Sequence, residues 1–308
     1  MWGISGGGEL IMQPPGSSHR RTPVSIFCHS CEEMPELESQ SVALIVTSFP
    51  YYNAIDYDIH ARDRSRNYRE RTYTKGFDNY LSYLAWIQRI FLGEVWRVTK
   101  PGRFLAVVVG SVLRNGQHLP LPADVTHRLT DGGWEYWENI TWHKTTAGVK
   151  RAGTAIQQKC PGYFYPNIMT ETILIFRKPG PLIYQGKSRT TKVSASFAID
   201  QLFVRDVAND IWHIAPVPPG LIAHPCPFPE EIPFRLIQLY SFPGDLVLDP
   251  FAGSGQTLKV AHALGRFAVG YESIPAYAEL ARRRIGEPLH VRKEQLVAKF
   301  EKIALGIN

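Results

Sequence analysis

The sequence predicts an α/β fold in which a mostly parallel, twisted sheet carries helices on both faces. Short apolar runs recur along the chain and alternate with segments of helical periodicity, which is the pattern of a parallel sheet covered by helices. The 308 residues, of which 44% are hydrophobic and 20% charged, are enough to bury a large core. A disordered or fibrous protein is therefore excluded.

Strands and helices alternate clearly before residue 177. The predicted strands are short runs of β-branched and other apolar residues, and the predicted helices have apolar residues on one face. Glycine and proline mark where these elements end. The elements are a strand over 42–47, a helix over 79–98 stopped by Lys100, Pro101 and Gly102, a strand over 103–110, a helix over 125–132, and strands over 134–142 and 170–176.

The rest of the chain divides into a weakly patterned part and a strongly patterned part. Residues 177–209 are polar, and residues 216–233 contain seven prolines, which predicts an extended connection. Clear alternation returns at Leu246. The elements expected from there are a strand over 246–249, a glycine turn, a helix over 256–264, a strand over 267–272, and helices over about 276–284 and 292–305.

Net charge indicates the kind of binding partner, and cysteine content indicates the cellular compartment. The 34 basic residues exceed the 28 acidic ones, and the resulting net charge of +6 favours a polyanionic partner. No apolar run reaches the roughly 18 to 20 residues that a membrane span needs, and residues 1–24 are expected to be a flexible tail without the features of a signal peptide. The four cysteines are too few for a disulfide scaffold, so a cytoplasmic location is expected.

A glycine turn between a strand and a helix is the clearest ligand-binding pattern. In LVLDPFAGSGQT, Gly253 and Gly255 allow close approach to the backbone and free the amides at the helix N-terminus. Glu272 ends the next strand about twenty residues later, where a carboxylate can accept hydrogen bonds from ribose hydroxyls. An ordinary strand–helix–strand unit also fits this spacing. The turn lacks the patterns of nicotinamide-binding and phosphate-binding loops.

The motifs become specific when they are taken together. DPFAGSGQT followed by LGRFAVGYE resembles motifs I and II of the S-adenosylmethionine-dependent amino methyltransferases of DNA, and TSFPYY at 47–52 resembles their catalytic motif IV. Motif IV precedes motif I, which is the permuted order of the β group of this family. Further segments similar to the family lie near Arg97, Asn139 and Glu171, and HPCPFPEEIPFRLI near His224 resembles motif X.

This resemblance implies a Rossmann-like S-adenosylmethionine methyltransferase fold with circularly permuted motif order. It also implies S-adenosyl-L-methionine as cofactor and methyl transfer to the exocyclic N4 amine of cytosine in duplex DNA, by base flipping and direct displacement. The serine of Ser48-Phe-Pro-Tyr favours cytosine, whereas enzymes that act on adenine N6 more often carry Asp or Asn at that position. Adenine N6 remains an alternative, as does a weakly active or inactive DNA-binding relative.

The resemblance also implies roles for individual residues. The Ser48 side chain and the Phe49 carbonyl would accept hydrogen bonds from the target amine, Pro50 would stiffen the turn, and Tyr51 would stack on the base. The cofactor-binding residues would be Asp249, Phe251, Gly253, Ser254, Gly255, Thr257, Glu272, His224 and Phe228.

Two positions depart from the family pattern. Phe49 stands where the family normally has the first proline of motif IV, so a fixed φ angle is lost and a backbone N–H is added. Ser30 stands where the β group often has an acid near the cofactor's adenine. These departures motivate the inactive alternative.

The cysteines offer two weaker hypotheses. Cys28 and Cys31 have C-x-x-C spacing, but Cys160 and Cys226 form no second pair, so no metal site is expected. Pro225-Cys226 resembles the nucleophile dipeptide of cytosine C5 methyltransferases, yet the Glu-Asn-Val segment that accompanies it is missing. Cys28 and Cys31 are predicted to be core thiols.

A basic loop after the catalytic motif is the main DNA-binding candidate. Residues 62–75 carry a net charge of +4, with Tyr68 and Tyr73 available for stacking, although a solvated loop with local ion pairs would also fit. Lys144, Lys150, Arg151 and Lys159 form a second basic stretch among glycines, which is expected to be a mobile DNA-facing loop. The basic residues of the first loop are Arg62, Arg64, Arg66, Arg69, Arg71 and Lys75.

Residues 25–308 are predicted to form one methyltransferase domain. Its expected parts are a catalytic half over 25–178, a small target-recognition region over about 180–210, a cofactor-binding half over about 211–285, and a C-terminal helix to 308. The expected partner is double-stranded DNA, with a cognate restriction endonuclease acting on the same site as a further one. No membrane partner is expected, and the protein would be a monomer or homodimer.

Overall fold

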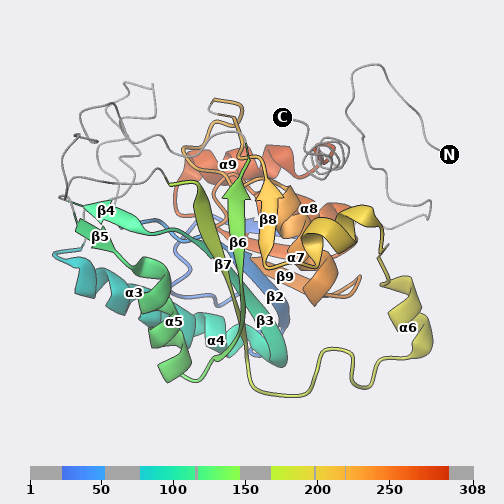
Figure 1. Cartoon of the computed structure of the whole chain (residues 1–308). Helices are drawn as coiled ribbons and strands as arrows, with labels where there is room; N and C mark the ends of the chain where they lie inside the picture. The colour runs from blue at the N-terminus through green and yellow to red at the C-terminus, as the bar shows by residue number, and fades with distance from the viewer. Residues whose placement is uncertain are drawn as a thin grey trace.

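The computed structural model describes residues 23–52, 77–114, 117–145, 168–197, 199–218 and 220–290. Its main feature is an eight-stranded sheet with strand order β1-β10-β9-β2-β3-β7-β6-β8 (Figure 1). Strand β7 is antiparallel to β3 and β6, and the other neighbours are parallel. The predicted mostly parallel sheet is confirmed. The strands are β1 Val24–Phe27, β2 Val42–Thr47, β3 Thr99–Val109, β6 Glu135–Lys144, β7 Thr170–Arg177, β8 Ile211–Ile214, β9 Leu246–Asp249 and β10 Phe267–Tyr271.

Helices cover both faces of the sheet, as predicted (Figure 1). On one face, α3, α4 and α5 pack against one buried apolar cluster, and on the other face α7 and α8 pack against a second. Adjacent residues of β2 point to the two clusters in turn, so this central strand is buried on both sides. The helices are α3 Tyr80–Leu92, α4 Glu94–Val98, α5 Leu121–Asp131, α6 Arg189–Ser194, α7 Glu231–Tyr240, α8 Gln256–Ala263 and α9 Pro275–Arg284.

Smaller elements lie outside the main sheet. Strands β4 Val112–Arg114 and β5 Gln117–Leu119 form a two-stranded sheet, and η3, Phe203–Val207, is a π-helix. Helix α9 contacts β1 and α8. Among the described residues, no helix is long and apolar enough to cross a membrane.

The helix predicted over 79–98 is two helices. Asn79 caps the first one, because its side chain accepts a hydrogen bond from the Ser82 amide while the Ser82 hydroxyl accepts from the Asn79 amide. Gly93 ends it, and a Cβ there would lie 2.6 Å from the Arg89 carbonyl oxygen. The second helix ends at Val98, just before residues 100–102, which were expected to stop it and which lie inside β3. Helix boundaries depend on these local contacts, which a periodic pattern does not contain.

Other boundaries also differ from the prediction. Strand β1 begins at Val24, inside the tail predicted to reach residue 24, and β8 lies at the opposite edge of the sheet where no strand was expected. Both are only four residues long, so neither run is long enough to give a clear strand pattern. Helix α7 begins at Glu231, within the predicted extended connection. The helix predicted over 292–305 lies outside the described residues.

Candidate active site

The segments that resemble motifs IV, I and II meet at one edge of the sheet. They follow β2, β9 and β10, which are neighbouring parallel strands, so their carboxyl ends lie side by side. In open α/β sheets this edge is where ligands bind. The Thr47 hydroxyl donates to Asp249 Oδ1 at 2.7 Å, and the Thr257 hydroxyl donates to the Val46 carbonyl at 3.1 Å. Two segments about 200 residues apart in sequence thus form one site.

The glycine turn has a backbone that only glycine adopts readily. Gly253 has φ +50° and Gly255 has φ +79°, both in the left-handed region. Gly255 is the N-cap of α8, and a Cβ on it would lie 2.8 Å from the Ala281 Cβ. The bare turn followed by a helix N-terminus fits the expected approach of a nucleoside-containing cofactor.

Glu272 is fixed against this turn. Its Oε2 accepts from the Gly253 amide at 2.9 Å and its Oε1 accepts from the Ile274 amide at 2.8 Å. The residue is 6% exposed and directly follows β10. Each carboxylate oxygen has further lone pairs, so the side chain retains capacity to accept other hydrogen bonds.

The segment that resembles motif X covers the glycine turn. A Cβ on Gly253 would lie 2.9 Å from His224 Nε2, so this imidazole lies directly over the glycine. The His224 ring packs edge-on against Tyr277, with 4.7 Å between ring centroids. Phe228 lies near the start of α8, because its carbonyl accepts a hydrogen bond from the Gln256 side chain at 2.8 Å.

A buried charged network supports the same turn. Arg284 donates to the Ser254 carbonyl and to Gln256 Oε1, both at 2.7 Å, and the fully buried Lys259 pairs with Glu230 at 2.6 Å. None of these contacts was predicted. Gln256 directly follows the predicted glycine turn, which could have singled it out, whereas Arg284 had no signal because it lies on a charged helical segment.

The catalytic motif segment is anchored by aromatic packing. The Phe49 ring is 1% exposed and lies edge-on to Phe91 and Tyr83, at centroid distances of 5.9 and 6.5 Å. The Tyr83 hydroxyl donates to the Pro50 carbonyl at 2.7 Å. Ser48 and Tyr51 are half-buried, in keeping with access from the site. The phenylalanine that replaces the family's proline is therefore a core residue.

Asp249 is a buried carboxyl group in this site. Burial raises the pKa of its carboxyl from 3.8 to about 6, although hydrogen bonds from Thr47 and from the Phe251 amide lower the pKa. Because the pKa is higher in the folded than in the unfolded chain, protonated Asp249 favours folding. Its stabilising contribution is complete below about pH 4 and is lost as the pH rises through about 6.

We expect Asp249→Asn to remove this pH dependence. Between pH 4 and pH 7 the free energy of unfolding of the variant should rise relative to wild type by roughly 2 to 3 kcal/mol, since an amide does not titrate. Urea denaturation of the cofactor-free proteins at several pH values measures this difference. The matched control is Asp131→Asn, whose side chain is 63% exposed. If the free energy of unfolding changed with pH in the same way in wild type and Asp249→Asn, the raised pKa of Asp249 would be contradicted.

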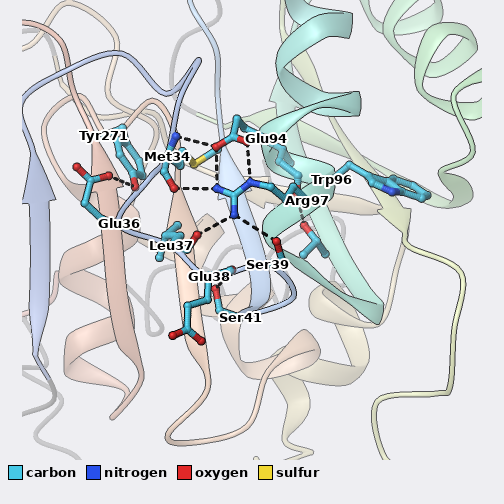
Figure 2. Close-up of polar contacts among 12 residues, drawn as sticks. Met34, Glu36, Leu37, Glu38, Ser39, Ser41, Glu94, Trp96, Arg97 and Tyr271 are labelled. Atoms are coloured by element: carbon cyan, nitrogen blue, oxygen red, sulfur yellow. Dashed lines mark hydrogen bonds and ion pairs between the residues drawn. The ribbon is translucent and has the colours of Figure 1, made fainter.

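The loop between β1 and β2 contacts the end of β10, because the Tyr271 hydroxyl donates to Glu36 Oε2 at 3.0 Å. One arginine holds this loop. Figure 2 shows the Arg97 guanidinium donating to the Met34 and Leu37 carbonyls while it pairs with Glu94. Glu94 also accepts from the Met34 amide at 2.7 Å. Ser30 lies in this loop, where its hydroxyl accepts from the Glu32 amide at 3.2 Å. The Arg97–Glu94 pair therefore fixes a loop beside the carboxyl end of β10.

The cysteines and basic residues need two corrections. Cys31 is buried as predicted, but Cys28 is exposed rather than a core thiol. Lys144, predicted to belong to a DNA-facing loop, is the last residue of β6 and is buried against Glu171. The other predicted DNA-binding positions lie outside the described residues: Arg62, Arg64, Arg66, Arg69, Arg71, Lys75, Lys150 and Arg151.

Known proteins similar in sequence are Type II methyltransferases. The family model N6_N4_Mtase, described as DNA methylase, matches residues 42–283. The Type II methyltransferase M.MthZI of Methanothermobacter thermautotrophicus is 28% identical over 292 residues, covering 91% of this chain and 81% of that protein. The Type II methyltransferase M.MjaI of Methanocaldococcus jannaschii is 29% identical, covering 85% of this chain and 90% of that protein.

Solved structures agree in fold. TTHA0409 of Thermus thermophilus, solved in complex with S-adenosyl-L-methionine, superposes with a TM-score of 0.65 at 30% identity, covering 87% of this chain and 98% of that one. The cytosine-N4-specific PvuII DNA methyltransferase has a TM-score of 0.61 at 21% identity, with coverages of 94% and 97%. The predicted Rossmann-like fold is confirmed. Because the family model spans most of the chain, this protein belongs to the N6_N4_Mtase family and is a DNA methyltransferase of the class that modifies exocyclic amines.

Proposed function

We propose that the protein transfers the methyl group of S-adenosyl-L-methionine to the N4 amine of cytosine in duplex DNA. The observation that carries this proposal is that Ser48 directly follows β2, whose last residue, Thr47, donates a hydrogen bond to Asp249 at the end of the neighbouring β9. A hydroxyl and a backbone carbonyl at this position can accept hydrogen bonds from the amine that receives the methyl group. Serine at this position favours cytosine over adenine.

The cofactor is proposed to lie along the glycine turn. Gly253 and Gly255 give the turn its left-handed backbone, and the Glu272 carboxylate would accept from the ribose hydroxyls. His224 and Phe228, from the segment that covers the turn, would contact the cofactor on one side. Asp249 and Phe251 would lie on the other side of the cofactor. Ser254 and Thr257 complete the proposed set. Bound S-adenosyl-L-methionine supplies an electrophilic methyl group on a sulfonium. The complex of TTHA0409 with this compound supports the proposal.

The chain's own residues are proposed to hold the amine in line with the methyl donor. The Ser48 hydroxyl and the Phe49 carbonyl would accept the two amine hydrogens, which directs the nitrogen lone pair at the methyl group. Tyr51 would stack on the base after it has left the duplex, at an unstacking cost of a few kcal/mol. Positioning of this kind supplies much of the rate gain in a direct displacement.

The proposed DNA-binding surface consists of basic residues and a recognition region. The basic residues between 62 and 75, together with Lys150 and Arg151, would neutralise backbone phosphates, and residues 180–210 would contact the recognition sequence. The Type II designation of M.MthZI and M.MjaI supports a role in restriction and modification beside an endonuclease for the same site.

Product analysis tests the proposal directly. The purified protein is incubated with duplex DNA of mixed sequence and S-adenosyl-L-methionine labelled in its methyl group, and the DNA is digested to nucleosides for mass spectrometry. Labelled N4-methylcytosine is the expected product. N6-methyladenine would overturn the choice of base, and binding of the cofactor and DNA without any product would favour an inactive relative.

Tyr51→Ala tests the proposed stacking role. We expect the kcat/KM for DNA to fall by about 5- to 150-fold, which corresponds to base stacking of roughly 1 to 3 kcal/mol. The dissociation constant for S-adenosyl-L-methionine should stay within twofold, because the ring is not assigned to the cofactor site. Tyr136→Ala, which removes an exposed ring from β6, is the control. An equal loss of cofactor and DNA binding would contradict the assignment.

A further inference from the structure

Three side chains from separate parts of the sheet meet beside the catalytic motif segment. The Tyr51 hydroxyl donates to Glu171 Oε2 at 3.1 Å, and the Lys144 ammonium donates to Glu171 Oε1 at 2.5 Å. Tyr51 follows β2, Glu171 belongs to β7 and Lys144 ends β6. One hydrogen bond thus connects the proposed stacking ring to a charged pair that lies far from it in sequence.

The strand order explains why these residues meet. Strands β2, β3, β7 and β6 are successive neighbours, and β7 alone among them runs in the opposite direction. The first residues of β7 therefore lie at the edge where β2, β3 and β6 end. Gly110 follows β3 at the same edge, and a Cβ there would lie 3.2 Å from Glu171 Cγ and 3.9 Å from the Tyr51 hydroxyl oxygen.

The charged pair is largely removed from solvent. The Lys144 and Glu171 side chains are 9% and 16% exposed, and Lys144 Nζ lies 5.0 Å from the centroid of the Trp142 ring. A buried ion pair adds little net stability, because the cost of desolvation offsets the attraction between the charges. Stability alone is thus a weak reason for placing such a pair beside the motif segment.

We propose that Glu171 and Lys144 are positioning residues for the target base and act through the Tyr51 ring. This inference rests on the proposed function. The Lys144 ammonium neutralises the Glu171 carboxylate, which as an anion offers only acceptors to the Tyr51 hydroxyl. The resulting hydrogen bond fixes the rotation of the Tyr51 side chain, so that the ring presents one face to the flipped base. Methyl transfer benefits because small misplacements of the amine cost large factors in rate.

A double-mutant cycle with Glu171→Gln and Tyr51→Phe tests the proposal. A glutamine has one accepting and one donating end, so it cannot accept from both the phenol and the ammonium. Tyr51→Phe keeps the ring and removes only the hydroxyl. Single-turnover methyl transfer is measured on DNA that the wild type methylates, together with the dissociation constant for S-adenosyl-L-methionine and the melting temperature. Glu138→Gln, an exposed carboxylate change on β6, is the control.

We expect each single variant to lose roughly tenfold in single-turnover rate, and the double variant to lose no more than either single variant, because both remove the same interaction. Cofactor affinity should match the control for all variants. The melting temperature of Tyr51→Phe should also match it, whereas that of Glu171→Gln should fall, because the buried Lys144 ammonium loses its counter-ion. An unchanged rate for Glu171→Gln, or multiplicative losses in the double variant, would overturn the inference. Absence of any methyl transfer by the wild type would instead overturn the proposed function, so the two failures are distinguishable.

Discussion

Replacing Glu272 by alanine is expected to weaken binding of S-adenosyl-L-methionine about 10- to 100-fold. The carboxylate accepts from the Gly253 and Ile274 amides, and its loss leaves both amides without this acceptor at the base of the glycine turn. A buried donor deprived of its partner costs about 1 to 3 kcal/mol, so the turn should leave its present conformation. The proposed hydrogen bonds to the ribose are lost at the same time. Isothermal titration calorimetry with the cofactor measures the change.

Two further variants separate these contributions. Glu272→Gln retains one accepting oxygen and should lose less affinity than Glu272→Ala, because one amide keeps its acceptor. Glu279→Ala removes a carboxylate that is 56% exposed on α9 and serves as the matched control. An unchanged dissociation constant for Glu272→Ala would falsify the ribose-binding role of this residue.

The central sheet and its glycine turn were predictable because their residues carry strong local patterns. The run VALIVT of β2 is buried on both faces, so every position is apolar except the last. The turn needs a left-handed backbone at Gly253 and Gly255, and glycine adopts that conformation with little strain. Strand β9, the turn and α8 therefore lie within one or two residues of the predicted bounds.

The contacts that complete the candidate site depend on strand order, which local patterns do not specify. Glu171 reaches Tyr51 only because the antiparallel β7 lies between β3 and β6. For the same reason Lys144, one basic residue among several in the sequence, is a buried partner of Glu171 rather than part of a DNA-facing loop. Single-sequence patterns indicate which residues carry chemistry, whereas long-range packing decides which of them meet.

Phe49→Pro, which restores the family's usual residue, is expected to harm the protein rather than activate it. The Phe49 ring is buried between Tyr83 and Phe91, so its removal leaves a cavity in the core. Loss of a buried phenylalanine side chain typically costs about 3 to 5 kcal/mol. The Phe49 carbonyl, which is the proposed amine acceptor, is present with either residue. Urea denaturation and the initial rate of methyl transfer measure the two expected effects.

Phe49→Leu is the matched control, because it keeps most of the buried volume without adding proline. Its expected loss is below about 1.5 kcal/mol, since hydrophobic exchanges that keep the volume are tolerated best. If Phe49→Pro proved as stable as wild type and faster in methyl transfer, the phenylalanine would impair catalysis and would not be needed for packing. The opposite result would mean that the aromatic cluster holds the segment that proline stiffens in the family's usual motif. Rigidity of the proposed acceptor would then come from side-chain packing, with the Tyr83 hydrogen bond to the Pro50 carbonyl as its second support.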